Sequence, residues 1–202
     1  MRRRLFAVLV GCLSAFMLAG TVLADTSPGP GNLRDSGSQL YLNASSAECD
    51  QSTCTETYVN AWITTGRGGD TFTNVCVDHY TYAAHGGSRF TAQFGCNEID
   101  PNVDIASDLS SGSVDAVIVM EECGRRSCTI VGEVSVSVDL TAVSDPNAYS
   151  YTQKQQFENC IDTWRVRGES SEAQGSIVFD GTNVEAFGGV GAETFAFSTR
   201  CR

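Results

Sequence analysis

The clearest pattern along the chain is a strict alternation of apolar and polar residues near its middle. Val134, Val136, Val138 and Leu140 are separated from one another by single serine or aspartate residues. A period of two places neighbouring side chains on opposite faces of an extended chain, so this segment is predicted to be a strand with one buried face. Similar but less regular runs predict further strands at residues 40–43, 57–65, 75–83, 89–96, 114–120, 161–167, 176–179 and 194–198.

Clusters of glycine and polar residues separate these runs, which is typical of turns. Helical periodicity is weak throughout, and the best candidate for a short helical turn, residues 151–157, lacks an apolar stripe. The body of the chain is therefore predicted to be all-β. The predicted turns lie at residues 66–70, 85–88, 110–113, 144–147 and 180–183.

The first 24 residues carry a different pattern, which is typical of a cleavable signal peptide. Arginines at 2–4 precede an uncharged, mostly apolar stretch at 5–23, and Ala24 precedes the charged Asp25. We expect cleavage after Ala24 and secretion of the remaining chain. A retained membrane anchor is less favoured, because glycine and serine residues dilute the apolar stretch. Residues 25–38, rich in proline, glycine and serine, are predicted to be a flexible lead-in.

The secreted part of the chain is strongly acidic. The whole chain has 13 basic and 24 acidic residues, and the leader removes three of the basic ones, which leaves a net charge of 10 − 24 = −14. Such a surface repels the phosphates of nucleic acids and the headgroups of anionic lipids. We therefore expect no nucleic acid partner, and no membrane contact after removal of the signal peptide.

Eight cysteines follow the leader, and an even number in a secreted chain favours disulfides over free thiols. Their spacing is not that of a structural zinc site, because the closest pairs are C-x4-C rather than C-x2-C. Eight cysteines allow many connectivities, and the sequence alone does not select one. The pairings that hairpin geometry favours are Cys49–Cys54, Cys76–Cys96, Cys123–Cys128 and Cys160–Cys201.

Two cysteine-containing patterns each occur twice, in the same order. Residues 48–55 (ECDQSTCT) are echoed by residues 122–129 (ECGRRSCT), and residues 76–80 (CVDHY) are echoed by residues 160–164 (CIDTW). Repeats of this kind are typical of a duplicated supersecondary unit, although two hairpins with independently similar closures would give the same pattern.

The fold class predicted from these patterns is an antiparallel β-sandwich built from two related, disulfide-linked units. The first unit would span residues 39–112 and the second residues 113–202. The two units would form either two small sandwiches in tandem or the halves of one larger sandwich.

An acidic stretch between the two predicted units offers candidate metal ligands. Asp100, Asn102, Asp104 and Asp108 supply oxygen atoms at the spacing of a calcium-binding loop. The stretch departs from an EF-hand loop, because the sixth position is Ile105 rather than glycine and no helical pattern flanks it. An acidic connection is the favoured interpretation, and calcium is the one cofactor that the sequence suggests.

The two histidines, His79 and His85, invite a catalytic interpretation. In a regular strand Asp78 and His79 point to opposite faces, so they cannot orient each other, and no nucleophile motif completes a triad. His85 stands beside two glycines, which is typical of a turn. Asp78 and Asp162 occupy equivalent places in the repeat, where a structural role is favoured over catalysis. We therefore expect no catalytic residue.

Five aromatic residues in predicted strands are candidates for a carbohydrate platform, on which sugar rings stack against aromatic rings. The competing interpretation is that most of them belong to the core. These residues are Tyr58, Trp62, Tyr80, Tyr82 and Trp164.

Three functional classes remain, in the following order. The first is a secreted, non-catalytic binding or surface-interaction protein that recognises an extracellular protein or glycan. The second is a secreted inhibitor of a hydrolase such as a protease, in which Arg125 and Arg126, between two cysteines, would enter a trypsin-like specificity pocket. The third is an extracellular hydrolase, which no motif supports.

Overall fold

The fold is given by a computed structural model, which describes residues 34–84, 90–97, 101–123, 127–157 and 159–201. These residues form ten strands and no helix, and every pair of neighbouring strands is antiparallel. The predicted all-β, antiparallel class is confirmed. The strands are β1 (Arg34–Cys49), β2 (Thr53–Gly66), β3 (Thr71–Ala83), β4 (Phe90–Asn97), β5 (Asn102–Ile105), β6 (Ser111–Cys123), β7 (Cys128–Ala142), β8 (Asn147–Phe157), β9 (Cys160–Phe179) and β10 (Thr182–Cys201).

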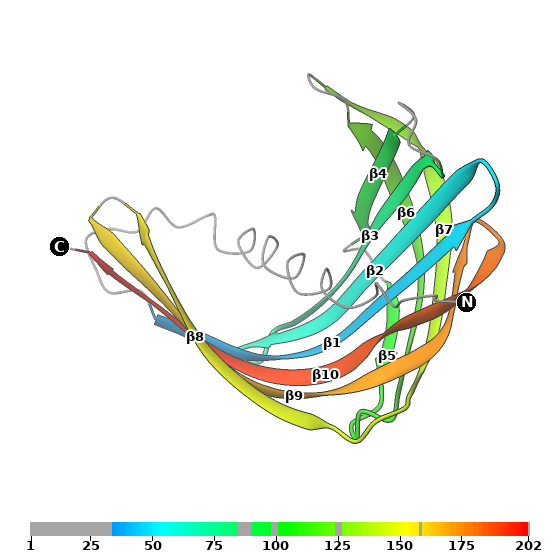
Figure 1. The fold of residues 1–202 in the computed structure, drawn as a ribbon. Coiled ribbons are helices and arrows are strands. Elements are labelled where there is room, and N and C mark those ends of the chain that lie inside the picture. Colours follow the sequence, from blue (N-terminus) through cyan, green and yellow to red (C-terminus); the bar gives the residue numbers. More distant parts are fainter. Residues whose placement is uncertain (1–33, 85–89, 98–100, 124–126, 158, 202) are drawn as a thin grey trace, which may run out of the picture. The chain divides into compact units, whose positions relative to one another are not determined.

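One sheet runs through all ten strands. Its order is β10-β1-β2-β3-β4-β6-β7-β9-β8, with β5 paired to β6, and β9 also pairs with β10. Eight of the strands therefore form a closed ring, and β8 lies outside it at an edge (Figure 1). Strands from both predicted units pair directly, since β1 pairs with β10 from Arg34↔Ser198 to Ser45↔Phe187. The two units thus share one sheet. That they arose by duplication of one unit stays a prediction.

The sharpest turn of the sheet joins β9 to β10 through Asp180 and Gly181. Both residues have a positive φ, 47° and 75°. A two-residue hairpin loop with positive φ at both positions matches the twist of the flanking strands, and Asp-Gly is a preferred sequence for it. The turn predicted at 180–183 is therefore present, and it sets the register of the longest strand pair in the sheet.

The core follows the alternation seen in the sequence. On β7, Val136, Val138 and Leu140 are buried, whereas Ser137 between them is half-buried and Asp139 is exposed. The ring encloses the matching residues of the other strands, and each buried Val, Leu or Ile contributes about 1.5–3 kcal/mol to folding. The core cluster comprises Leu42, Ala44, Val59, Ala61, Val75, Val77, Ile105, Leu109, Val114, Ile118, Met120, Val136, Val138, Leu140, Ala173, Ile177, Ala186 and Val190.

Part of the sheet continues beyond the ring, because β9 changes its partner along its length. Residues 173–179 of β9 pair with β7, whereas residues 160–170 pair with β8. We call the second part the extension; it consists of β8, residues 160–170 of β9, residues 191–201 of β10 and residues 34–40 of β1. The long strands β1, β2, β9 and β10 bend between the two parts (Figure 1).

Two sequence predictions fail in the extension. The predicted helical turn at 151–157 is wrong, because these residues belong to β8 and pair with β9 from Tyr151↔Val166 to Phe157↔Cys160. An exposed run of polar residues without an apolar stripe forms no stable helix of its own. Its backbone N–H and C=O groups form hydrogen bonds with the edge of β9 instead. Residues 34–38, predicted as part of the flexible lead-in, belong to β1 and pair with β10.

Four disulfides cross-link the sheet, and each joins two directly opposite residues of neighbouring strands. They are Cys49–Cys54, Cys76–Cys96, Cys123–Cys128 and Cys160–Cys201, the same pairings that the sequence favours. Two of them close hairpin tips, β1–β2 and β6–β7, and the Cys160–Cys201 bond ties the end of the extension. Cross-links of this kind are typical of proteins from oxidising compartments.

Candidate functional site

The face of the sheet opposite the core carries most of the large aromatic side chains. Directly paired residues of antiparallel strands share a face, so the register places Trp62 beside Tyr41 and Trp164 beside Phe197 on this face. All five aromatic residues of the predicted carbohydrate platform lie on it. None of the five belongs to the core cluster of the described residues. We call it the aromatic face.

The densest group on the aromatic face lies on β2 and β3. It consists of Glu56, Tyr58, Asp78, Tyr80 and Tyr82, which we call the tyrosine cluster. The register explains how they meet, since Tyr58 is opposite Asp78 and Glu56 is opposite Tyr80. The period of two on each strand then adds Tyr82 to the same face.

The side chains of the tyrosine cluster hold one another in place. The hydroxyl of Tyr58 donates a hydrogen bond to Glu56 Oε2 at 3.0 Å, and the hydroxyl of Tyr82 donates one to Oε1 at 2.6 Å. The rings of Tyr58 and Tyr80 meet edge to face, with 6.0 Å between centroids, and Tyr80 stacks on Phe90 at 6.1 Å. Such aromatic arrangements are the preferred ones, so the cluster is a fixed surface of rings and carboxylates.

Burial controls the charges of the tyrosine cluster. It raises the pKa of Tyr58 to about 12, with a smaller contribution from the hydrogen bond to Glu56, so this hydroxyl stays a donor at neutral pH. Burial also raises the pKa of the Asp78 carboxyl. Among the described residues, no side chain or backbone group donates a hydrogen bond to Asp78. Asp78 therefore offers an unused acceptor between aromatic rings.

A second group with the same chemistry lies on the aromatic face of the extension. Tyr149 donates a hydrogen bond to Glu193 Oε2 at 2.8 Å, and the hydroxyls of Tyr149 and Tyr41 are 3.2 Å apart. The rings of Trp164 and Phe197 pack beside them, with 4.4 Å between centroids. Burial raises the pKa of both Tyr149 and Glu193. A half-buried carboxylate that accepts a hydrogen bond from a tyrosine hydroxyl thus occurs twice on one face.

The sequence does not single out Tyr41, Tyr149 or Glu193. They are far apart along the chain, and the pairing of β1 with β10, of β10 with β9 and of β9 with β8 brings them together. The alternation of each strand shows which of its residues share a face, but the register between strands is a long-range property. Tyr149 is also the one residue of β8, all of which is described, that is not exposed.

The histidine that the structure describes lies on the core side of its strand. As expected, Asp78 and His79 point to opposite faces of β3. His79 Nδ1 is 3.0 Å from Thr57 Oγ1, and its ring stacks on Phe179 at 4.5 Å. Thr57 is buried, His79 is half-buried, and burial lowers the pKa of His79. His85 lies outside the described residues.

The predicted calcium ligands are spread over a strand and a turn. Asn102 and Asp104 are exposed on β5, and Asp108 accepts a hydrogen bond from the backbone N–H of Ser110 at 3.1 Å. Hydrogen bonds from Ser110 lower the pKa of Asp108. Asp100 lies outside the described residues, so calcium binding stays a prediction. Equal melting temperatures in chelator and in millimolar calcium would contradict it.

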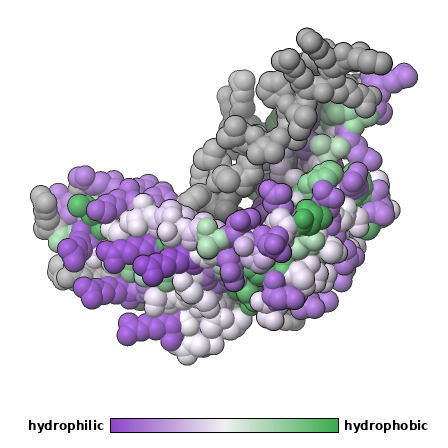
Figure 2. All heavy atoms as spheres, turned by 60° about the horizontal axis from the view of Figure 1, so that its bottom comes forward, coloured by the Kyte–Doolittle hydropathy of each residue, from purple (hydrophilic) through white to green (hydrophobic). Residues whose placement is uncertain are grey.

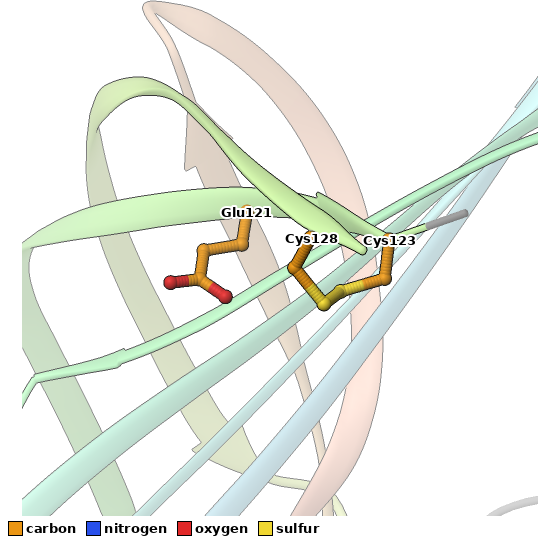
Figure 3. Close-up of side chains that lie close together, drawn as sticks. All are labelled: Glu121, Cys123 and Cys128. Atoms are coloured by element: carbon orange, nitrogen blue, oxygen red, sulfur yellow. A yellow bond between two sulfur atoms is a disulfide. The ribbon is translucent and has the colours of Figure 1, made fainter. Parts of the chain in front are cut away.

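Glu121 lies beside the disulfide at the tip of the β6–β7 hairpin. Its carboxylate is within 4.8 Å of the sulfurs of Cys123 and Cys128. Figure 3 shows that the two sulfurs are bonded to each other. Neither can then supply the thiolate that a soft metal ion prefers, so this group is not a metal centre in the oxidised protein. Arg125 and Arg126, between the two cysteines, lie outside the described residues.

Comparisons with protein families, with curated proteins and with solved structures find no match to this chain. The described residues include no helix of the length and apolarity needed to cross a membrane. The two tyrosine and carboxylate groups on the aromatic face are the chemistry on which a functional assignment rests.

Proposed function

We propose that the protein is a secreted, non-catalytic binding protein and that its aromatic face binds a glycan. The tyrosine cluster carries this proposal. Sugar rings present apolar C–H faces and a periphery of hydroxyls, and the cluster offers the complement of both, namely aromatic rings and carboxylate acceptors. The signal-peptide pattern and the four disulfides support secretion.

The fixed geometry of the tyrosine cluster favours binding. Glu56 has both oxygens occupied by tyrosine hydroxyls, so Tyr58 and Tyr82 lose little freedom when a ligand arrives. Asp78 has no such partner among the described residues and is the natural acceptor for a sugar hydroxyl. A second group of the same kind around Glu193 suits a chain of sugars rather than a single ring.

The test is binding to a glycan array by the secreted protein and three variants. Tyr80→Ala removes the ring at the centre of the cluster, and Asp78→Asn weakens the free acceptor; both should lower binding at least tenfold. Ile161→Ala is the matched control, because Ile161 is an exposed apolar residue of β9 that the alternation from Trp164 places on the opposite face of the sheet. Circular dichroism checks that each variant folds. No glycan bound by the wild type, or unchanged binding by Tyr80→Ala, would overturn the proposal.

A second candidate is inhibition of a trypsin-like protease by the loop between Cys123 and Cys128. The observation in its favour is the disulfide that closes this loop at the hairpin tip, since a pinned loop loses little entropy in an enzyme cleft. Nanomolar inhibition that disappears in an Arg125→Ala/Arg126→Ala variant would place this function first. Absence of inhibition would remove it.

A further inference from the structure

The basic residues of this acidic protein are gathered at one place. The structure describes six basic side chains, and all of them lie in the extension or in the β2–β3 turn that adjoins it. They are Arg34, Arg67, Lys154, Arg165, Arg167 and Arg200. In a secreted chain of net charge −14, this concentration of positive charge is the opposite of the surrounding surface.

The register places five of these residues on one face of the extension. Arg34 is opposite Ser198, Ser198 is opposite Thr163, and Thr163 is opposite Lys154. Arg165, Arg167 and Arg200 belong to the same face by the period of two. This face is opposite the aromatic face, because Trp164 and Phe197 alternate with these residues. Figure 2 shows hydrophilic side chains gathered over this end of the sheet.

Four of the arginines line a pocket of about 380 Å³. They are Arg34 from β1, Arg67 from the β2–β3 turn, Arg165 from β9 and Arg200 from β10. Between them lie the short side chains of Ser36, Thr163, Ala196, Ser198 and Thr199, which leave room, and Ser36, Thr163 and Ser198 carry hydroxyl donors. The pocket volume is at the lower end of the range for small organic ligands, which is roughly 300–1,000 Å³.

The charges of the pocket are not balanced within the described part of the chain. No hydrogen bond or ion pair joins any of the four guanidinium groups to another described residue. One carboxylate, that of Asp35, also lines the pocket, so four positive charges face one negative charge; Asp35 accepts a hydrogen bond from the N–H of Ser36 at 2.7 Å. The nearby Asp162 accepts one from the Thr199 hydroxyl at 2.7 Å. Four like charges around one cavity repel one another, and an anion between them would relieve that repulsion.

We propose that this arginine pocket binds a small organic molecule carrying a phosphate, sulfate or carboxylate group. The planar fork of an arginine side chain donates paired hydrogen bonds to such oxyanions, and hydroxyls complete their coordination. Lys154 and Arg167, on the same face but outside the pocket lining, attract the anion from solution. The charge of the rest of the chain favours a small ligand over a long polyanion, which would extend beyond the basic face onto acidic surface.

The experiment titrates the secreted, full-length protein by calorimetry at constant ionic strength. The probes are glucose 6-phosphate, glucose 6-sulfate and glucuronic acid, with glucose and sodium chloride as controls. At least one charged probe should bind with one site per chain, and glucose should not. The identity of the binding probe distinguishes the three oxyanions. No binding by any charged probe, or equal heat from sodium chloride, would overturn the proposal.

Variants locate the site. Arg165→Gln and Arg200→Gln should each weaken binding of the successful probe about tenfold or more, because each removes charge-assisted hydrogen bonds. Arg167→Gln is the matched control: it is on the same strand and face as Arg165 but does not line the pocket, and it should change binding only slightly. Equal effects of all three variants would contradict a defined pocket. Tyr80→Ala should leave anion binding unchanged, so this site and the glycan site succeed or fail independently.

Discussion

At the scale of single residues, the buried polar side chains show where a substitution could raise the stability of the fold. Thr57 and His79 form a hydrogen bond with each other on the core-facing side of the sheet. Ser171 does not share this property: it is 2 % exposed, and its hydroxyl has no hydrogen-bond partner among the described residues. A buried hydroxyl without a partner costs about 1–3 kcal/mol relative to an apolar group of similar shape.

Replacing Ser171 with alanine should therefore stabilise the protein. We expect Ser171→Ala to raise the free energy of unfolding by about 1 kcal/mol, measured by denaturant titration. The control is Ser137→Ala, because the Ser137 hydroxyl donates a 2.6 Å hydrogen bond to Asp115 and its loss should give no gain. A lower stability of Ser171→Ala would show that this hydroxyl has a partner in solution.

His79 should make the stability depend on pH. Burial lowers its folded-state pKa below the unfolded value of about 6.5, so the unfolded chain binds the extra proton more readily. The contribution of neutral His79 is complete above pH 6.5 and is lost as the pH falls below it. Asp78 and Glu193, whose pKa values are raised, act in the opposite direction and gain stability as the pH falls.

The comparison of wild type with His79→Gln isolates the histidine, since both chains keep the carboxyl groups. The loss of unfolding free energy between pH 7.5 and pH 5 should be larger in the wild type than in the variant. Equal losses in the two proteins would mean that His79 titrates normally. Denaturant titrations at the two pH values measure the difference.

At the scale of elements, the sequence predicts which segments are strands better than how they pair. The alternation of Val136, Val138 and Leu140 is a local property, and it identifies β7 directly. The Asp180-Gly181 turn and the two C-x4-C hairpin tips are local as well. The length of β9 is not a local property. Its residues 168–175 are rich in serine and glutamate, and they form a strand only because β10 and other strands pair with them. The aromatic face and the arginine pocket depend on this pairing, so neither follows from the sequence.

The disulfides should differ in strength according to the length of chain that they enclose. Cys160–Cys201 spans 41 residues, whereas Cys49–Cys54 spans 5. In the chain-entropy model, removal of the first costs about 4 kcal/mol and removal of the second about 2 kcal/mol. We expect the Cys160→Ser/Cys201→Ser double variant to melt well below the Cys49→Ser/Cys54→Ser variant in calorimetry. The reverse order would contradict the entropic account.

At the scale of the whole molecule, the ring of strands is closed by one short strand pairing, which we call the weak joint. β4 and β6 share only the residue pairs Gln93↔Glu122 and Phe94↔Glu121, whereas β9 and β10 pair along twenty residues. A side-chain hydrogen bond from Asn97 Nδ2 to the carbonyl of Val117, at 2.9 Å, adds to the joint. No local sequence pattern predicts this closure, because β4 forms its hairpin with β3 and β6 forms its hairpin with β7.

The ring should therefore open first between β4 and β6. Hydrogen exchange followed by mass spectrometry should show faster exchange for peptides of β4 than for peptides of the central part of β10, because local opening there breaks fewer contacts. The Cys76–Cys96 bond keeps β4 attached to β3 during such opening. Slower exchange in β4 than in β10 would contradict a weak joint.

The four disulfides also determine how proteolytic cleavage would change the molecule. Each one bridges the two strands on either side of a turn, so a peptide bond cut between its cysteines leaves both fragments covalently attached. A cut at the Asp180-Gly181 turn, for example, leaves β9 and β10 joined through Cys160 and Cys201. A cut after Arg125 or Arg126, where trypsin-like enzymes act, leaves β6 joined to β7 through Cys123 and Cys128. The nicked chain would keep its mass under non-reducing conditions and separate into pieces only when reduced.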